Sequence, residues 1–147
     1  MTMTATRTDE TVQIRRLIED WADAVRACDL DRIMAAYTPD IVSFDAIAQL
    51  QFRGAEAYRR HWQACLAMCS GMIFEVHHLE IETGEGVAFG HYLVRCGGTG
   101  PDGQEQVGWM RVTVCFRRTG GRWSIAHEHF SVPFDMESGK ALLDLEP

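Results

Sequence analysis

Asp45 is the residue of this chain whose surroundings point most clearly to chemistry. The sequence predicts a short helix that ends near Tyr37, a turn at Pro39–Asp40, and a brief apolar strand that places Asp45 directly after Phe44. A carboxylate among apolar residues is costly to ionise unless it is paired. Asp45 is therefore either a general base, able to take a proton from a carbon next to a carbonyl group, or the capping residue of a turn with no chemical role. The residues alone leave both interpretations open.

His127 and His129 form the second group that could do chemistry. They lie two positions apart on a predicted strand, so both side chains project to the same side. With Asp45 or His91 they could bind a divalent metal ion. His127 could instead pair with Asp45 as acid and base, because imidazole titrates near neutral pH. No stronger ligand motif accompanies the histidines, and we expect a site without a metal ion or other cofactor.

The elements that must position these residues change in type along the chain. Apolar residues at helical spacing predict helices over 9–27, 31–37 and 55–68, with short strands over 40–44 and 51–53. Longer strands are predicted over 72–82, 87–96, 106–118 and 122–132, separated by glycine-containing turns of the kind that hairpins favour. Helices followed by an antiparallel meander indicate an α+β fold. We expect one domain over 9–133, a flexible leader over 1–8 and a C-terminal tail over 134–147.

Charge and composition exclude several classes of function. The formal net charge of -7 argues against nucleic-acid binding, which needs a basic face. No apolar run is long enough to span a membrane, and the polar N-terminus does not resemble a signal peptide. Five cysteines, an odd number without close pairing, predict free thiols in a reducing cytoplasm. The protein is thus expected to be cytoplasmic.

The order of the elements resembles the nuclear transport factor 2-like (NTF2-like) fold over roughly Glu10 to Pro133. The resemblance implies a cone in which three N-terminal helices pack on a curved, mostly antiparallel sheet, with a pocket at the wide end. The stretch Asp29-Leu30-Asp31-x-Ile33, continued without a gap to Asp45, resembles the ketosteroid isomerases. The ending from Gly121 to Pro133 resembles the SnoaL-like branch of the superfamily, which takes its name from a polyketide cyclase.

The resemblance to ketosteroid isomerases implies that Asp45 shuttles a proton. Two departures from the pattern of those enzymes imply a different substrate. Those enzymes hold the developing oxyanion with a tyrosine and a protonated carboxylic acid. The matching positions carry Trp21 and Thr113 here, so authentic steroid isomerisation is not expected. Arg111, or a protonated His91 or His127, would stabilise the negative oxygen instead.

The resemblance further implies which strand faces line the pocket. By apolar pattern alone, Met110, Val112, Val114 and Phe116 would face the core, whereas the resemblance turns Arg111 and Thr113 inward. Both arrangements are compatible if a second subunit covers the apolar face, because an exposed apolar sheet is a liability. We therefore expect a homodimer through the outer sheet face.

The expected catalytic residues are Asp45, His127 and Arg111, and the expected substrate-binding residues are Trp21, Tyr37, Phe44, Trp62, Phe74, Phe89, His91, Trp109, Thr113 and His129.

These expectations favour a small enzyme that moves a proton on an apolar or aromatic carbonyl compound. The alternative is a dimeric ligand-binding or association module without catalysis, since fold resemblance alone does not establish a reaction. A third reading is a metal-dependent hydrolase built on the histidine pair.

Overall fold

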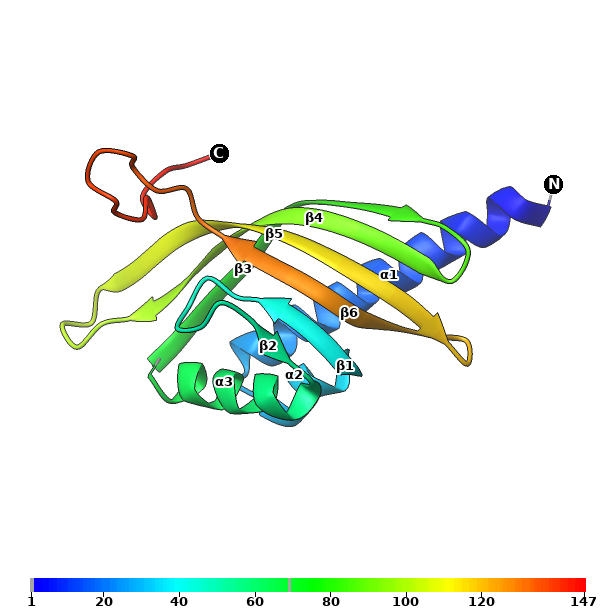
Figure 1. Ribbon diagram of the computed structural model, residues 1–147, viewed down its shortest axis with the longest axis horizontal. Helices are drawn as coiled ribbons and strands as arrows, with labels where there is room; N and C mark the ends of the chain where they lie inside the picture. Colours follow the sequence, from blue (N-terminus) through cyan, green and yellow to red (C-terminus); the bar gives the residue numbers. More distant parts are fainter. Residues whose placement is uncertain (1, 69) are drawn as a thin grey trace.

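The computed structural model describes residues 2–68 and 70–147, which form three helices and six strands (Figure 1). The helices are α1 (Thr2–Arg26), α2 (Leu30–Ala35) and α3 (Ala55–Ala67). The strands are β1 (Tyr37–Phe44), β2 (Phe52–Arg53), β3 (Ser70–Thr83), β4 (Val87–Thr99), β5 (Glu105–Thr119) and β6 (Arg122–Ser131). The predicted α+β class is confirmed.

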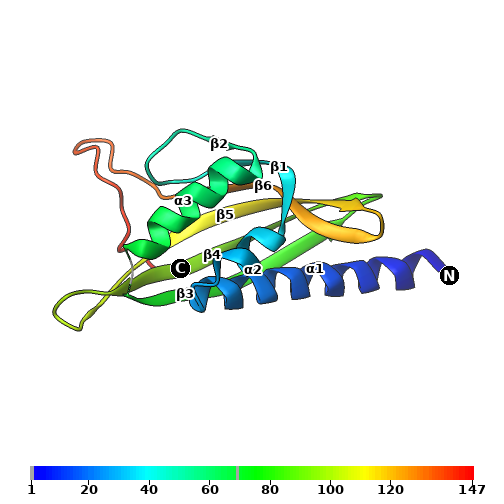
Figure 2. The same cartoon turned by 90° about the horizontal axis from the view of Figure 1, so that it is seen from below.

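The strands form a single curved sheet in the order β2-β1-β6-β5-β4-β3 within the described residues. Neighbouring strands are antiparallel except β1 and β6, which run parallel. Gly120 and Gly121 make the tight turn between β5 and β6, and both have positive φ, as a two-residue hairpin of this type requires. In Figure 2 the helices lie together on one side of the sheet.

The core lies between this inner sheet face and the helices. Val112, Val114 and Phe116 of β5 are buried in one cluster with Ile14 and Ile18 of α1. Burying such a side chain contributes roughly 1.5–3 kcal/mol. The alternation of strand side chains then directs the odd-numbered residues of β5 to the opposite, outer face of the sheet.

The expectation that Arg111 and Thr113 face the pocket is therefore wrong. Both side chains are exposed on the outer face, where Arg111 Nε donates to Ser131 Oγ at 3.2 Å. The physical reason is that the apolar residues of β5 lie in the core cluster that also contains residues of α1, which leaves the charged and hydroxyl side chains in solvent. The apolar pattern of the strand predicted its faces correctly, and the resemblance did not.

A β-bulge in β6 reverses the side-chain pattern of the last strand. In β5, Phe116 pairs with Ile125, and the preceding residue, Cys115, pairs with His127. Ala126 is left without a partner in β5 and is therefore the extra residue. A bulge of this kind shifts the alternation by one position. Residues before the bulge face the core at odd numbers and residues after it at even numbers. As a result Glu128 is buried and His129 is exposed, the opposite of the expected arrangement.

The segments on either side of the expected domain contain described structure. The helix α1 begins at Thr2, so it includes residues 2–8; an established helix extends readily, since each added residue gains one hydrogen bond. The C-terminal segment turns back beside β5, where the Trp109 N–H donates to Leu143 O at 3.0 Å. None of the helices in the described residues has the length and hydropathy needed to cross a membrane.

Candidate functional site

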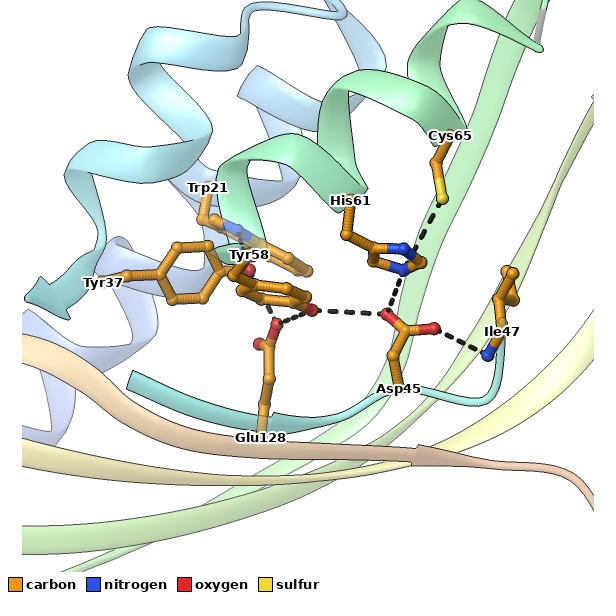
Figure 3. A network of polar contacts seen from close by, with 8 residues as sticks. All are labelled: Trp21, Tyr37, Asp45, Ile47, Tyr58, His61, Cys65 and Glu128. Atoms are coloured by element: carbon orange, nitrogen blue, oxygen red, sulfur yellow. Dashed lines mark hydrogen bonds and ion pairs between the residues drawn. The ribbon is translucent and has the colours of Figure 1, made fainter. Parts of the chain in front are cut away.

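Asp45 lies just after β1 and faces α3 (Figure 3). One carboxylate oxygen, Oδ1, accepts the Ile47 N–H at 3.0 Å and so closes a short turn. The other, Oδ2, lies 3.3 Å from His61 Nε2 and 3.4 Å from Tyr58 Oη. The capping interpretation therefore describes one oxygen of Asp45, while the second oxygen lies between the His61 imidazole and the Tyr58 hydroxyl.

His61 is the partner of Asp45 that the sequence interpretation did not single out. The imidazole is only 6% exposed and the Asp45 side chain 12%. The His61 ring stacks on Phe52, with centroids 4.1 Å apart, which holds the Nε2 edge toward Asp45. The spacing of Tyr58, His61, Trp62 and Cys65 is i, i+3, i+4 and i+7, the pattern of a buried helix face. That signal was present in the sequence.

Asp45 and His61 form the polar part of a cavity of about 160 Å³ beneath α3. The rest of the lining is apolar or sulfur-containing. It consists of Val25, Ile47, Trp62, Cys65, Met72, Phe74, Cys96, Gly97, Met110 and Phe130. None of the described lining residues is an arginine or lysine. A site of this composition suits a neutral ligand with a mainly apolar body.

A buried network of tyrosines connects Asp45 to Glu128 behind the cavity (Figure 3). Tyr58 Oη lies 2.6 Å and Tyr37 Oη 2.7 Å from the same oxygen, Glu128 Oε1. The Trp21 indole N–H donates to Tyr37 Oη at 3.1 Å. Glu128 itself is 1% exposed, and it reaches this position because of the bulge at Ala126.

Burial changes the proton affinities of this network. The pKa of Glu128 is raised to about 7: desolvation is the largest cause, hydrogen bonds from Tyr58 and Tyr37 oppose it, and the charge of Asp45 adds to the increase. Burial and the charge of Glu128 raise the pKa of Tyr37 and of Tyr58 well above the usual range of a phenol. Both tyrosines therefore keep their protons, whereas the raised pKa of Glu128 brings its change of charge near neutral pH.

The expected substrate-binding residues separate into three groups. Trp62 and Phe74 line the cavity with Asp45. Trp21 and Tyr37 lie in the core behind it, with Trp21 packed edge-on against Trp62 and Phe74 at centroid distances of 5.9 and 5.3 Å. The other expected substrate-binding residues lie on the outer face of the sheet or at its rim, away from the cavity, together with the expected catalytic residues Arg111 and His127: Phe44, Phe89, His91, Trp109, Thr113 and His129.

His127 and His129 do not meet Asp45, so the expected pairing with it is wrong. The bulge in β6 is the reason, because it turns this part of the strand over. Both rings pack against Phe44, with centroids 4.8 and 5.6 Å away. His127 Nδ1 lies 2.6 Å from Val42 O and must carry a proton there, since a carbonyl oxygen only accepts. Among the described residues, no three His, Cys, Asp or Glu side chains converge as a metal site would require.

The arrangement around Asp45 can exchange protons with a bound molecule. A carboxylate and an imidazole 3.3 Å apart can share one proton, so the pair can accept a proton and return it. The two groups that sequence reasoning missed are His61 and Glu128. For Glu128 the signal was weak: the buried apolar residues of β6 change from odd numbers, Trp123 and Ile125, to an even number, Phe130.

Comparisons with known proteins agree with this architecture. The SnoaL-like domain matches residues 14–135. An NTF2-like protein of unknown function from Pseudomonas putida KT2440 is 48% identical, with a TM-score of 0.87 and 98% of each chain covered.

More distant structures share the fold alone. A candidate dehydratase of the NTF2-like family from Streptomyces avermitilis is 14% identical, with a TM-score of 0.78, over 85% of this chain and 97% of its own. A candidate aromatic ring hydroxylase from Novosphingobium aromaticivorans is 20% identical, with a TM-score of 0.76, over 84% and 89%. A search of curated proteins finds no match. With its helices on one face of a curved sheet and the SnoaL-like domain over most of its length, the chain belongs to the SnoaL-like family of the NTF2-like superfamily.

Proposed function

We propose that this protein is an acid–base enzyme that moves a proton on a small, neutral, mainly apolar carbonyl compound. The observation that carries the proposal is the Asp45–His61 pair at the only charged part of an apolar cavity, as far as the described lining residues go. An acid–base pair in contact with a bound molecule typically accelerates a reaction by about 10²–10⁴-fold.

The size of the cavity limits the substrate. An apolar cavity of about 150 Å³ is large enough for a benzene-sized molecule, and the cavity beside Asp45 measures about 160 Å³. A single-ring compound fits this volume better than a steroid. The lack of an arginine or lysine among the described lining residues favours a neutral ligand over a carboxylate or phosphate.

The proposed step begins with Asp45 Oδ2, assisted by His61. The carboxylate takes a proton from the carbon next to the carbonyl group, and the electron pair of that C–H bond moves to the carbonyl oxygen as an enolate. If a carbon–carbon double bond is conjugated with the enolate, return of the proton to the far end of that system shifts the double bond and completes an isomerisation. If the carbon β to the carbonyl carries a hydroxyl group, the enolate electron pair forms a carbon–carbon double bond, the β C–O bond breaks, and the leaving oxygen takes the proton and departs as water. The latter outcome would be a dehydration, the activity suggested for the Streptomyces relative.

The decisive experiment measures proton exchange, which requires no knowledge of the product. The protein is incubated in D₂O with a panel of neutral single-ring ketones, and loss of the α-proton signal is followed by NMR. We expect the wild-type protein to accelerate exchange for at least one compound and Asp45→Asn to lose about 10²-fold or more of that rate. The asparagine keeps an oxygen for the Ile47 N–H.

Asp40→Asn is the matched control. It removes a carboxylate from the exposed side of the same strand, where Asp40 pairs with Arg117 at 3.0 Å. We expect wild-type exchange in this variant. Full exchange in Asp45→Asn would refute Asp45 as the base. Binding of these ketones without exchange in the wild-type protein would refute the enzyme and favour a ligand-binding module.

The outer face of the sheet supports association of two copies of the chain. Phe44, Val87 and Phe89 are 38%, 59% and 47% exposed there. Apolar side chains gathered on one exposed face favour contact with another protein surface. A homodimer therefore remains our proposal, but through the face that carries these residues and the histidines, not through Val112 and Val114.

A further inference from the structure

We propose that Glu128 and Asp45 act as one coupled proton site, linked by the Tyr58 hydroxyl, so that Glu128 controls the hydrogen bonding of the base. The inference rests on the proposed function for its catalytic meaning, although the coupling itself can be measured without a substrate. Glu128 does not line the cavity. It is thus a positioning residue that acts through Tyr58.

The first step of the argument is a count of protons. A phenol carries one hydrogen to donate. The proton of Tyr37 is committed to Glu128, because the oxygen of Tyr37 already accepts the Trp21 N–H, which can only donate. Tyr58 has no such constraint. Its hydroxyl lies 2.6 Å from Glu128 Oε1 and 3.4 Å from Asp45 Oδ2, and one proton cannot serve both carboxylates at once.

The charge of Glu128 decides where that proton goes. When Glu128 is ionised, the short contact draws the Tyr58 proton to Glu128, and Asp45 Oδ2 then faces an oxygen without a hydrogen. When Glu128 is protonated, it no longer needs the proton of Tyr58, and the hydroxyl is free to donate to Asp45. Asp45 therefore has one hydrogen bond fewer in the first state, and a carboxylate that loses a hydrogen bond accepts a proton more readily.

The surroundings of Glu128 allow this change near neutral pH. Four titratable groups interact with Glu128: Tyr37 on β1, Tyr58 on α3, Tyr92 on β4 and Asp45 after β1. Burial and the charge on Glu128 raise the pKa of Tyr92 well above its usual range, as for the other two tyrosines. The three phenols therefore stay neutral. The raised pKa of Glu128 brings its own change of charge near neutral pH, and Asp45, with His61 beside it, lies on the other side of the Tyr58 hydroxyl.

A carboxyl-carbon NMR titration of the whole protein tests the coupling directly. The ¹³C signals of Asp45 and Glu128, assigned with Asp45→Asn and Glu128→Gln, are followed from pH 5 to pH 9. We expect the Asp45 signal to show an inflection at the midpoint of Glu128. In Tyr58→Phe, Glu128 should still titrate while that inflection of Asp45 is lost. Glu128→Gln should abolish the same inflection, and it serves as the second test if Tyr58→Phe does not fold.

Tyr37→Phe is the matched control, since it removes a hydrogen bond from Glu128 without touching Asp45. The midpoint of Glu128 should rise, and the inflection of Asp45 should move with it. An inflection that persists unchanged in Tyr58→Phe would overturn the proposal, because simple charge repulsion would then explain it. Absence of the inflection in the wild-type protein would overturn it as well.

These outcomes are independent of the proposed enzyme activity. Failure of proton exchange with every ketone would leave the NMR coupling intact. Conversely, exchange that depends on Asp45 without any coupled inflection would refute only the role of Glu128. If both hold, the pH profile of exchange should contain the Glu128 midpoint in the wild-type protein and lose it in Tyr58→Phe, which a purely structural role of Tyr58 would not produce.

Discussion

Glu128→Gln should make the protein less sensitive to alkaline pH. Glu128 is fully enclosed, and desolvation raises its pKa from an ordinary value of 4.5 to about 7. A carboxyl group with a raised pKa in the folded state binds its proton more tightly there than in the unfolded chain. Its stabilising contribution is therefore complete below about pH 4.5 and is lost as the pH rises through about 7. Glutamine cannot ionise and has no such dependence.

The magnitude follows from the two proton affinities. Each unit of pKa difference corresponds to about 1.4 kcal/mol. Between pH 5 and pH 8 the difference between about 7 and 4.5 predicts that the wild-type protein loses about 2.5 kcal/mol of unfolding free energy relative to Glu128→Gln. Any constant effect of the substitution on hydrogen bonds to Tyr37 and Tyr58 cancels in this comparison.

The assay is urea denaturation of both proteins at several pH values, with Glu85→Gln as the control. Glu85 is exposed in the turn between β3 and β4, so the same chemical change there should give a stability difference from wild type that is flat with pH. The reasoning is refuted if the difference between Glu128→Gln and wild type is also flat. A difference that changes in the opposite direction would mean that the folded protein stabilises the ionised form of Glu128.

Three further predictions concern the core, the C-terminal segment and the outer face. Trp21→Phe removes the N–H that donates to Tyr37 and should lower the unfolding free energy by at least about 1 kcal/mol in denaturant titrations, whereas unchanged stability would show that this hydrogen bond contributes nothing. Gly108→Ala would place a methyl group 2.9 Å from Leu143 Cβ, so amide exchange of the C-terminal segment should accelerate; exchange at the wild-type rate would contradict the packing described. Phe89→Asp should convert a dimer into a monomer in sizing experiments, and a monomeric wild-type protein would refute the proposed interface.

Some features of the site could be predicted because they depend on local sequence. The position of Asp45 after a short strand follows from the apolar run that precedes it, and Trp62 and Phe74, which were expected near it, line the same cavity. The burial of His61 was also readable, since it lies on the same helical face as Tyr58 and Trp62. In that case the information was in the spacing, and the error lay in its interpretation.

The last strand shows where such reasoning stops. Strict alternation placed His127 and His129 toward Asp45, but one extra residue at Ala126 turned both outward and brought Glu128 into the core. A bulge depends on how the strand pairs with β5, which no local pattern specifies. The change of parity between Ile125 and Phe130 was the sole trace of it in the sequence.

The sequence by itself determined the α+β class, the order of helices and strands, and a carboxylate at the end of a short strand, because these depend on the periodicity of neighbouring residues. Only the tertiary structure decided which polar groups meet. Asp45 is brought to His61 by the packing of α3, and to Glu128 through Tyr58 by the bulge in β6. Asp45 and Glu128 lie 83 positions apart along the chain and contact the same Tyr58 hydroxyl, and this depends on strand register and helix packing that only the folded chain specifies.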